Sequence, residues 1–331
     1  MIFARDSEAI RWANETVGLS WSGRARRVVE AAHAVGLFER LGKAPAAVGD
    51  LARDLALDAE MVEKVLIVLA AMGLAGRRGR HWLLSPKAEA TLVPEAPLYQ
   101  GNTLAHSAQV WSRWNNLEFA LRGQPGGWVF SEAAEQGFRS YRDFILAMHN
   151  MAMAGRAAEL ADRVDLGARQ TLVDVGGGPG TYAMALCERN GGLRATVMDL
   201  PEAVEIARGL IERFGLADRV RAVVGDWNEA EFGVDVDAVL LSNVLHGPTS
   251  DAEMKLAKAH RAMTPGGLLI IQDFLMNPEK TGPLIPALFN LMVGGFSVTE
   301  LTDRVAAAGF AGIRVRPMPD GVGTTVVTAT R

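Results

Sequence analysis

A glycine-rich run with one carboxylate stands where an apolar segment gives way to an amphipathic one. Residues 172–180 read LVDVGGGPG, and the glycines at 176 and 178 leave room for a ligand to approach the backbone. Asp199 follows Gly178 by 21 residues, about the spacing at which a carboxylate on the next strand accepts both ribose hydroxyls. Gly176, Gly178 and Asp199 are therefore predicted to bind an adenosine-type ligand.

The charge beside this loop distinguishes between adenosine ligands. A dinucleotide fingerprint has glycine three positions beyond Gly178, whereas this chain has Thr181. Asp174, two residues before the glycines, would repel a pyrophosphate but suits a ligand that carries an ammonium and a sulfonium. S-adenosylmethionine is such a ligand, and we expect it to be the cofactor, with S-adenosylhomocysteine as its product.

A further acidic residue ends a later apolar run. Asp226, in Gly225-Asp226-Trp227, closes the third predicted strand and is expected at the same edge of the sheet. Its carboxylate is predicted to accept a hydrogen bond from the adenine amino group. Trp227 is predicted to stack on the adenine ring.

These residues need a scaffold that brings the ends of separate strands to one edge. After Thr171, short apolar runs alternate with amphipathic helical patterns: TLVDV, ATVMD, VRAVVGD, AVLLSN and GLLIIQDF. Repeated strand–helix units form a parallel sheet with helices on both faces. The runs near 313–316 and 322–328 are separated only by a Pro/Gly turn and are expected to pair antiparallel.

The segment before this region has a different pattern. From Gly23 to about Pro86 the apolar spacing is helical, with Asp58 as an expected N-cap and Gly73 as the end of the third helix. A hairpin-like segment follows at 77–84, which completes a winged-helix outline. Residues 98–164 are predicted to form further helices, interrupted by a glycine-rich loop at 123–127.

The composition restricts partners and location. The 331-residue chain has a formal net charge of −4, which gives no general attraction for nucleic acid. Its one cysteine, Cys187, cannot form an internal disulfide and fits a buried helix face. No apolar stretch suits a signal peptide or a membrane helix. We expect a cytoplasmic protein with no membrane or nucleic-acid partner.

Several motifs in order resemble the small-molecule O-methyltransferases, a family that includes caffeate, acetylserotonin and bacterial polyketide methyltransferases. The resemblance rests on LVDVGGGPG, the D-L-P at 199–201, the GDW at 225–227, SNVLHGPTSDAE at 242–253 and MTPGGLLIIQDF at 263–274. It implies a class I methyltransferase fold: a Rossmann-like α/β domain with a mostly parallel seven-stranded sheet and an antiparallel last strand. A winged-helix dimerisation domain at 1–95 would precede it. Residues 96–331 would contain a helical linker and the catalytic domain, whose core begins near residue 171.

The resemblance also implies catalytic residues. His246 matches the family's catalytic base, although Gly247-Pro248 replaces the usual Asp-Trp, and Asp273 matches the carboxylate that orients it. Leu200 belongs to the cofactor motif, and Ser242 stands where the family has a lysine. A second carboxylate, expected before the late helix, has no match, since Glu300 comes about five residues too late.

These roles suit methyl transfer to oxygen. A phenol of pKa about 10 is mostly neutral at pH 7, and a histidine of pKa about 6.5 accepts its proton as the new bond forms. The predicted acceptor is a small aromatic or secondary metabolite. Its pocket is expected to include six residues on helical segments, namely Trp111, Met148, His149, Met151, Phe289 and Met292.

Three alternatives remain open. Carbon methylation of a tetrapyrrole or another electron-rich ring would depend less on one base. A winged-helix regulator that senses an adenosine ligand would use the basic residues Arg77, Arg78 and Arg80. The third is an NAD-dependent oxidoreductase. No Cys/His/Asp cluster has the spacing of metal ligands, so no metal is expected.

Overall fold

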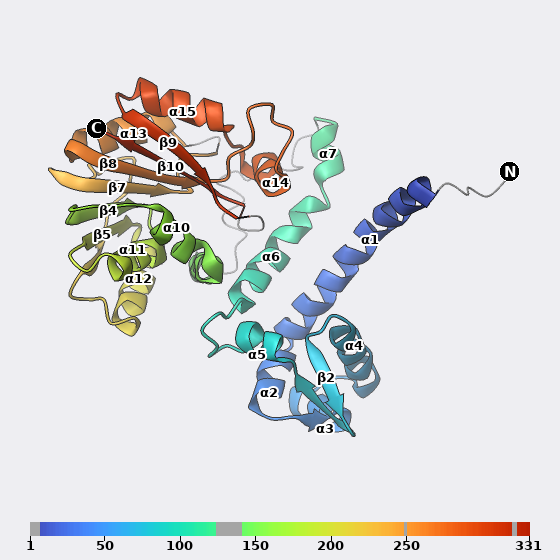
Figure 1. Ribbon diagram of the computed structural model, residues 1–331. Coiled ribbons are helices and arrows are strands. Elements are labelled where there is room, and N and C mark those ends of the chain that lie inside the picture. Colours follow the sequence, from blue (N-terminus) through green and yellow to red (C-terminus); the bar gives the residue numbers. More distant parts are fainter. Residues whose placement is uncertain (1–6, 124–140, 248–249, 320–322) are drawn as a thin grey trace. The chain divides into compact units, whose positions relative to one another are not determined.

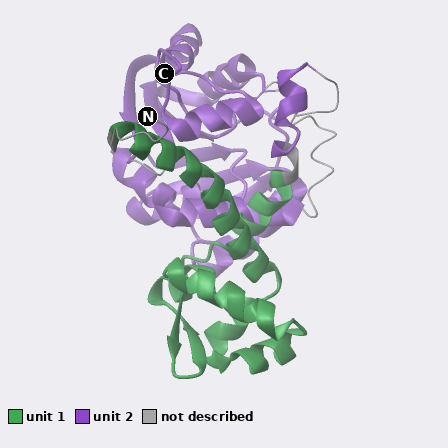
Figure 2. Cartoon of the chain, turned by 90° about the vertical axis from the view of Figure 1, so that its right-hand side faces the viewer, with its two compact units in different colours: residues 1–112 green, residues 113–331 purple. Residues whose placement is uncertain are grey.

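The computed structural model describes residues 7–123, 141–247, 250–319 and 323–331. The chain divides into two compact units, Met1–Ser112 and Arg113–Arg331 (Figures 1 and 2). The division falls within helix α6 (Gly101–Trp114). Residues 124–127 of the predicted loop, together with Pro248 and Val322, lie outside the described residues.

The N-terminal unit is mainly helical and contains a small sheet. Its elements are α1 (Ser7–Ala34), α2 (Leu37–Lys43), β1 (Ala46–Ala47), α3 (Val48–Leu55), α4 (Ala59–Ala71), β2 (Ala75–Arg78), β3 (His81–Leu84), α5 (Pro86–Leu92) and most of α6 (Gly101–Trp114). The strands are ordered β1-β3-β2, and β2 pairs antiparallel with β3. The predicted wing hairpin is therefore confirmed.

The start of α1 differs from the prediction. The helix begins at Ser7, whereas the apolar pattern indicated a start near Gly23. Residues 7–22 are mostly exposed, and Trp12, Leu19 and Trp21 are 55%, 75% and 62% exposed. Because this part of the helix buries no stripe of apolar residues within its own unit, its sequence lacks the periodicity that revealed the second half.

The second unit alternates strands and helices. Its helical elements are α7 (Leu117–Leu121), α9 (Tyr141–Met151), η1 (Ala152–Arg156), α10 (Ala157–Arg163), α11 (Thr181–Arg189), α12 (Pro201–Arg213), α13 (Ala252–Ala262), α14 (Leu284–Val293) and α15 (Val298–Ala307). Its strands are β4 (Thr171–Val175), β5 (Arg194–Asp199), β6 (Val220–Val224), β7 (Val236–Ser242), β8 (Met263–Asp273), β9 (Ala311–Pro317) and β10 (Thr325–Thr330). No described helix is long and apolar enough to cross a membrane.

The seven strands form one sheet in the order β6-β5-β4-β7-β8-β10-β9 (Figure 1). β4 to β8 pair in parallel. The last strand, β10, is antiparallel to both of its neighbours, β8 and β9. This arrangement confirms the predicted class I sheet and the pairing of its last two strands.

Alternation along the strands separates two cores. On β4 and β7, Leu172, Ala238 and Leu240 belong to the core that includes residues of α10, α11 and α12. Their chain neighbours Val173 and Val239 belong to the core that includes residues of α13 and α15. Cys187 is buried in the first of these cores, as its apolar setting indicated. The period of two therefore decides which helices each strand residue meets.

The N-cap of α4 provides a test of the local structure. The Asp58 carboxylate accepts a hydrogen bond from Met61 N at 2.9 Å, as predicted. We expect Asp58→Ala to lower the free energy of unfolding of the N-terminal unit by about 1 kcal/mol, measured by urea denaturation. Asp58→Asn keeps an oxygen acceptor and should remain close to the wild type. Equal stability of the alanine variant would contradict the role of the cap.

Candidate active site

The carboxyl ends of the parallel strands gather the predicted residues of the second unit. Val175 pairs with Met198, Asp199 with Val224, and Ser242 with Gln272, so β4 to β8 end at one edge of the sheet. The loops that follow carry the glycine run, Leu200, Asp226 and Trp227, and His246. A doubly wound sheet binds its ligands at this edge.

Glycine is required at several positions of the loop after β4. Gly176 and Gly178 have φ values of +64° and +53°, in the left-handed region that favours glycine. A Cβ at Gly177 would lie 2.7 Å from the Asp174 carboxylate. Gly176 N donates to Met198 O at 2.8 Å, which ties the loop to β5. The loop thus keeps bare backbone at the sheet edge.

Asp174 is a buried carboxylate without a charge partner. Its side chain is fully buried, and neither oxygen accepts a hydrogen bond of normal geometry from a described residue. Burial, followed by the nearby charge of Asp199, raises the pKa of Asp174 to about 7. The Ala183 N–H offsets only part of this rise. An unpaired carboxylate in this position fits a cationic ligand group.

Asp199 is held by the backbone on both of its oxygens. Oδ2 accepts from Gly178 N at 2.7 Å, and Oδ1 accepts from Leu200 N at 2.7 Å. Burial raises the pKa of Asp199 above its usual value, and these two N–H groups offset only part of that rise. A carboxylate oxygen has two lone pairs, so each still has one for a ribose hydroxyl.

Asp226 and Trp227 lie on the neighbouring loop. Asp226 Oδ1 accepts a hydrogen bond from Asn228 N at 2.7 Å. The Trp227 ring lies against the glycine loop, since a Cβ at Gly176 would be 2.5 Å from it. The Lys255 ammonium is 4.3 Å from the centre of the same ring. Contacts with the glycine loop and with Lys255 therefore fix the position of the Trp227 ring.

His246 and Asp273 form a hydrogen-bonded pair. His246 Nδ1 lies 2.8 Å from Asp273 Oδ1, and the Asp273 side chain is only 2% exposed. Asp273 Oδ1 also accepts from Phe274 N at 2.7 Å. With the carboxylate ionised, Nδ1 carries the proton and Nε2 keeps a free lone pair. The pair therefore has the arrangement of a general base and the group that orients it.

Aromatic rings surround this pair on one side. The His246 ring meets Phe289 edge-on, with 4.5 Å between ring centres. Phe289 also stacks on Phe274 at 4.2 Å. Of the predicted acceptor residues, Phe289 on α14 therefore contacts His246 directly. Met292 lies half-buried on the same helix.

The predicted acceptor residues on α9 have a different position. His149 Nδ1 lies 2.8 Å from Thr181 Oγ1, at the start of α11, and its ring meets Phe214. Burial, followed by the charge of Arg213, lowers the pKa of His149 to about 4, so the ring is neutral at pH 7. Met148 and Met151 are half-buried on α9. This helix thus contacts the start of α11, directly after the glycine loop, through the hydrogen bond between His149 and Thr181.

Trp111 belongs to the other unit. It lies on α6, and the Arg26 guanidinium is 4.2 Å from the centre of its ring.

Glu300 is engaged away from His246: it forms a capping box with Ser297 and an ion pair with Lys280. It therefore does not replace the second carboxylate of the family.

Ser242 was among the predicted cofactor residues, but sequence reasoning missed its two polar neighbours, Gln272 and Tyr182. Ser242 and Gln272 are buried on the strand face that carries Asp174, and Tyr182 reaches them from α11. Burial raises the pKa of the Tyr182 phenol, and Arg156, Gln272 and Ser242 offset part of this rise. The sequence signal that could have found this cluster is Tyr182, two residues after the last glycine of the loop. The direction of its side chain depends on how α11 packs, which the sequence does not show.

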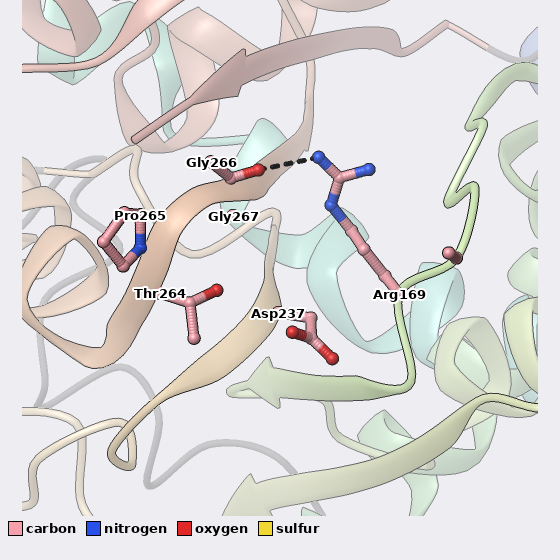
Figure 3. Close-up of a pocket in the computed structure, with 7 residues that line it drawn as sticks. Arg169, Asp237, Thr264, Pro265, Gly266 and Gly267 are labelled. Atoms are coloured by element: carbon pink, nitrogen blue, oxygen red, sulfur yellow. Dashed lines mark hydrogen bonds between the residues drawn. The ribbon is translucent and has the colours of Figure 1, made fainter.

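A hollow at the opposite edge of the sheet is not a comparable site (Figure 3). It is lined by residues that include Arg169, Asp237 and Gly266. Arg169 donates to Gly266 O at 2.8 Å, and Asp237 accepts from Gln170 N at 2.9 Å. The Arg169 guanidinium and the Asp237 carboxylate thus already have hydrogen-bond partners within the protein. Among the described residues, no group of His, Cys, Asp and Glu could hold a metal ion.

Comparison with known proteins agrees with this geometry. The model of the O-methyltransferase domain matches residues 127–306, more than half of the chain. The N,N-dimethyltransferase OxyT of Streptomyces rimosus is 29% identical over 315 residues, covering 92% of this chain and 91% of that protein. The 3-hydroxy-5-methyl-1-naphthoate 3-O-methyltransferase of Streptomyces sahachiroi is 29% identical over 302 residues, covering 87% and 86%.

A solved structure has the same fold. Human N-acetylserotonin methyltransferase in complex with SAM superimposes with a TM-score of 0.84 at 21% identity, covering 100% of this chain and 99% of that one. The expected family is confirmed by the domain match, which includes the glycine loop, His246 and Asp273. The chain belongs to the O-methyltransferase family.

Proposed function

We propose that this enzyme uses S-adenosylmethionine to methylate a hydroxyl group of a small aromatic acceptor, with His246 as the general base. The observation that carries the proposal is the pair His246 Nδ1 and Asp273 Oδ1, 2.8 Å apart, at the sheet edge that also holds the unpaired carboxylate of Asp174. The His246–Asp273 pair suits removal of a proton from the acceptor. The Asp174 carboxylate suits a cationic cofactor.

The residues present fit S-adenosylmethionine. Asp174 would hold the ammonium group, since its carboxylate is buried and unpaired. Asp199 would accept the ribose hydroxyls, and the bare backbone of Gly176 and Gly178 would allow the ligand close. Leu200, Asp226 and Trp227 would border the adenine, while Ser242 lies deeper, beside Tyr182. When bound, the cofactor supplies an electrophilic methyl group on a sulfonium.

Arg156 is a candidate for the carboxylate end of the same ligand. It forms no ion pair with an acidic side chain among the described residues, and burial lowers the pKa of its guanidinium. Electrostatic contact with Tyr182 places it near the cluster below Asp174. A ligand carboxylate would restore the missing counter-charge.

His246 would take the proton of the acceptor hydroxyl at Nε2. Asp273 would hold Nδ1 protonated and stabilise the imidazolium that forms. Phe289 and Phe274 would provide an apolar wall for a flat acceptor. Methyl transfer needs correct alignment above all, which explains why these side chains are fixed by packing.

We also propose that the enzyme is a homodimer and that its acceptor is the only other partner. Helix α1 exposes several large apolar side chains. Because large exposed apolar patches mark interaction surfaces, we expect a second copy of the chain to cover them. The cytoplasmic location follows from composition alone and stays a prediction.

Methylation of carbon or nitrogen is the second candidate. Glu300 is engaged with Ser297 and Lys280, so it does not serve as the family's second carboxylate. A carbon nucleophile depends less on a base. The regulator and the NAD-dependent oxidoreductase have no observation in their favour beyond the sequence features already given.

The base assignment is tested by turnover. His246→Ala should lower methyl transfer to phenolic acceptors by roughly 10²–10⁴-fold, because the proton then has no positioned acceptor. Binding of S-adenosylhomocysteine, measured by calorimetry, should be unchanged. The matched control His81→Ala, in the wing, should keep full turnover. Full turnover by His246→Ala would instead favour carbon methylation.

The glycine loop is tested by one added methyl group. Gly176→Ala should reduce affinity for S-adenosylhomocysteine by more than about tenfold, since φ is +64° and the new Cβ would lie 2.5 Å from the Trp227 ring. Gly192→Ala is the control, because its Cβ would meet nothing within 4 Å. The idea fails if both variants bind equally well.

Protonation of Asp174 should control cofactor affinity. Its pKa of about 7 means that the carboxyl is neutral below that pH and has no charge to offer an ammonium. Affinity for S-adenosylhomocysteine should therefore rise between pH 6 and pH 8, and binding near pH 6.5 should release a proton. Calorimetry in buffers of different ionisation enthalpy measures both. Asp174→Asn should bind S-adenosylhomocysteine weakly, with an affinity that does not change with pH. If the affinity of the wild type also did not change between pH 6 and pH 8, the role of Asp174 would be refuted.

A further inference from the structure

Helix α13 carries two lysines that are almost completely buried. Lys255 is 1% exposed and Lys258 is 6% exposed. A buried ammonium loses its hydration and is kept only where protein groups replace the water. Neither lysine forms an ion pair with an acidic side chain in the described part of the chain. Their partners must therefore come from the backbone and from neutral side chains.

Lys258 is bound by one loop only. Its ammonium donates to Trp227 O, Asn228 O and Ala230 O at 2.8, 2.9 and 2.9 Å. Three carbonyls satisfy its three protons. Lys258 therefore anchors the backbone of the loop that presents Trp227.

Lys255 connects two loops. Its ammonium donates to Val244 O at 2.8 Å and to Ser250 Oγ at 3.0 Å, and these residues flank His246. Ser250 Oγ donates in turn to Val244 O at 3.0 Å. The same ammonium also lies 4.3 Å from the centre of the Trp227 ring. One cation thus bonds to a residue on each side of His246 in the chain and lies against the ring beside the glycine loop.

Gly176 completes the connection. A Cβ there would meet both the Trp227 ring, at 2.5 Å, and Val244 Cγ1, at 2.8 Å. Trp227, Val244 and the glycine loop are therefore packed together, and Lys255 bonds to the first two. Asp226 and Asp251 stabilise its charge at longer range, while burial lowers the pKa of its ammonium.

We propose that Lys255 is a positioning residue that couples occupation of the adenosine pocket to the placement of His246. Ligand contact with Trp227 is transmitted through the Lys255 ammonium to the carbonyl of Val244 before the base and to the hydroxyl of Ser250 after it. The inference rests on the proposed function, because it takes Trp227 as part of the cofactor site.

The test compares two identical substitutions on one helix. Lys255→Met and Lys258→Met both keep an apolar stem and remove the ammonium. S-adenosylhomocysteine is titrated by calorimetry, and the His246 imidazole is followed by NMR in protein with ¹⁵N-labelled histidine. The six histidines are distinguished with His246→Gln. Circular dichroism checks that each variant is folded.

In the wild type, we expect S-adenosylhomocysteine to bind and to shift the His246 signals. Lys255→Met should bind roughly tenfold more weakly and lose that shift even at saturation. Lys258→Met should also bind more weakly but keep the shift, because it does not contact the turn of His246. A merely structural lysine would give the same result at both positions.

Ser250→Ala provides a milder second variant that removes one of the two partners of Lys255. It should bind S-adenosylhomocysteine within about twofold of the wild type and show a reduced His246 shift. It carries the test alone if Lys255→Met does not fold. A normal His246 shift in Lys255→Met, or in Ser250→Ala when that is the only folded variant, overturns the inference. Failure of the wild type to bind would instead overturn the proposed cofactor.

Discussion

The common direction of β4 to β8 determines where every candidate residue of the second unit can lie. These strands pair in parallel, so the loops after Val175, Asp199, Val224, Ser242 and Asp273 leave from one edge. Segments separated by up to about a hundred residues in the chain are thereby neighbours. This constraint brings the carboxylate of Asp174 and the imidazole of His246 to the same edge of the sheet, which the proposed reaction requires.

The alternation of side chains then divides the work between the two faces. Asp174, Ser242 and Gln272 follow the strand positions that face α11, while Asp273 is displaced by one residue and meets His246. A shift of one residue along β8 would exchange Gln272 and Asp273. The pleat of a single strand therefore separates the proposed polar end of the cofactor site from the proposed base.

The interior of this unit contains charges that are treated in opposite ways. The ammonium groups of Lys255 and Lys258 are contacted by carbonyls, a hydroxyl and an aromatic ring, which replace part of their lost hydration. The Asp174 side-chain oxygens accept no hydrogen bond of normal geometry from the described residues, and burial, followed by the charge of Asp199, raises the pKa of Asp174 to about 7. A satisfied charge fixes geometry, whereas an unsatisfied one favours a ligand of opposite charge.

The sequence by itself determined the local features: the glycine loop, the Asp58 cap, the wing hairpin, the strand–helix order and the choice of His246 and Asp273. Each depends on residue type and short spacing, or on motifs in order. The tertiary structure alone decided that Asp199 is bonded to Gly178 N, that His149 contacts Thr181, and that Lys255 joins two loops. These contacts depend on the direction in which side chains point across packed elements. Periodicity assigns a residue to a helix face or a strand face, but it does not say which partner the fold brings to that face.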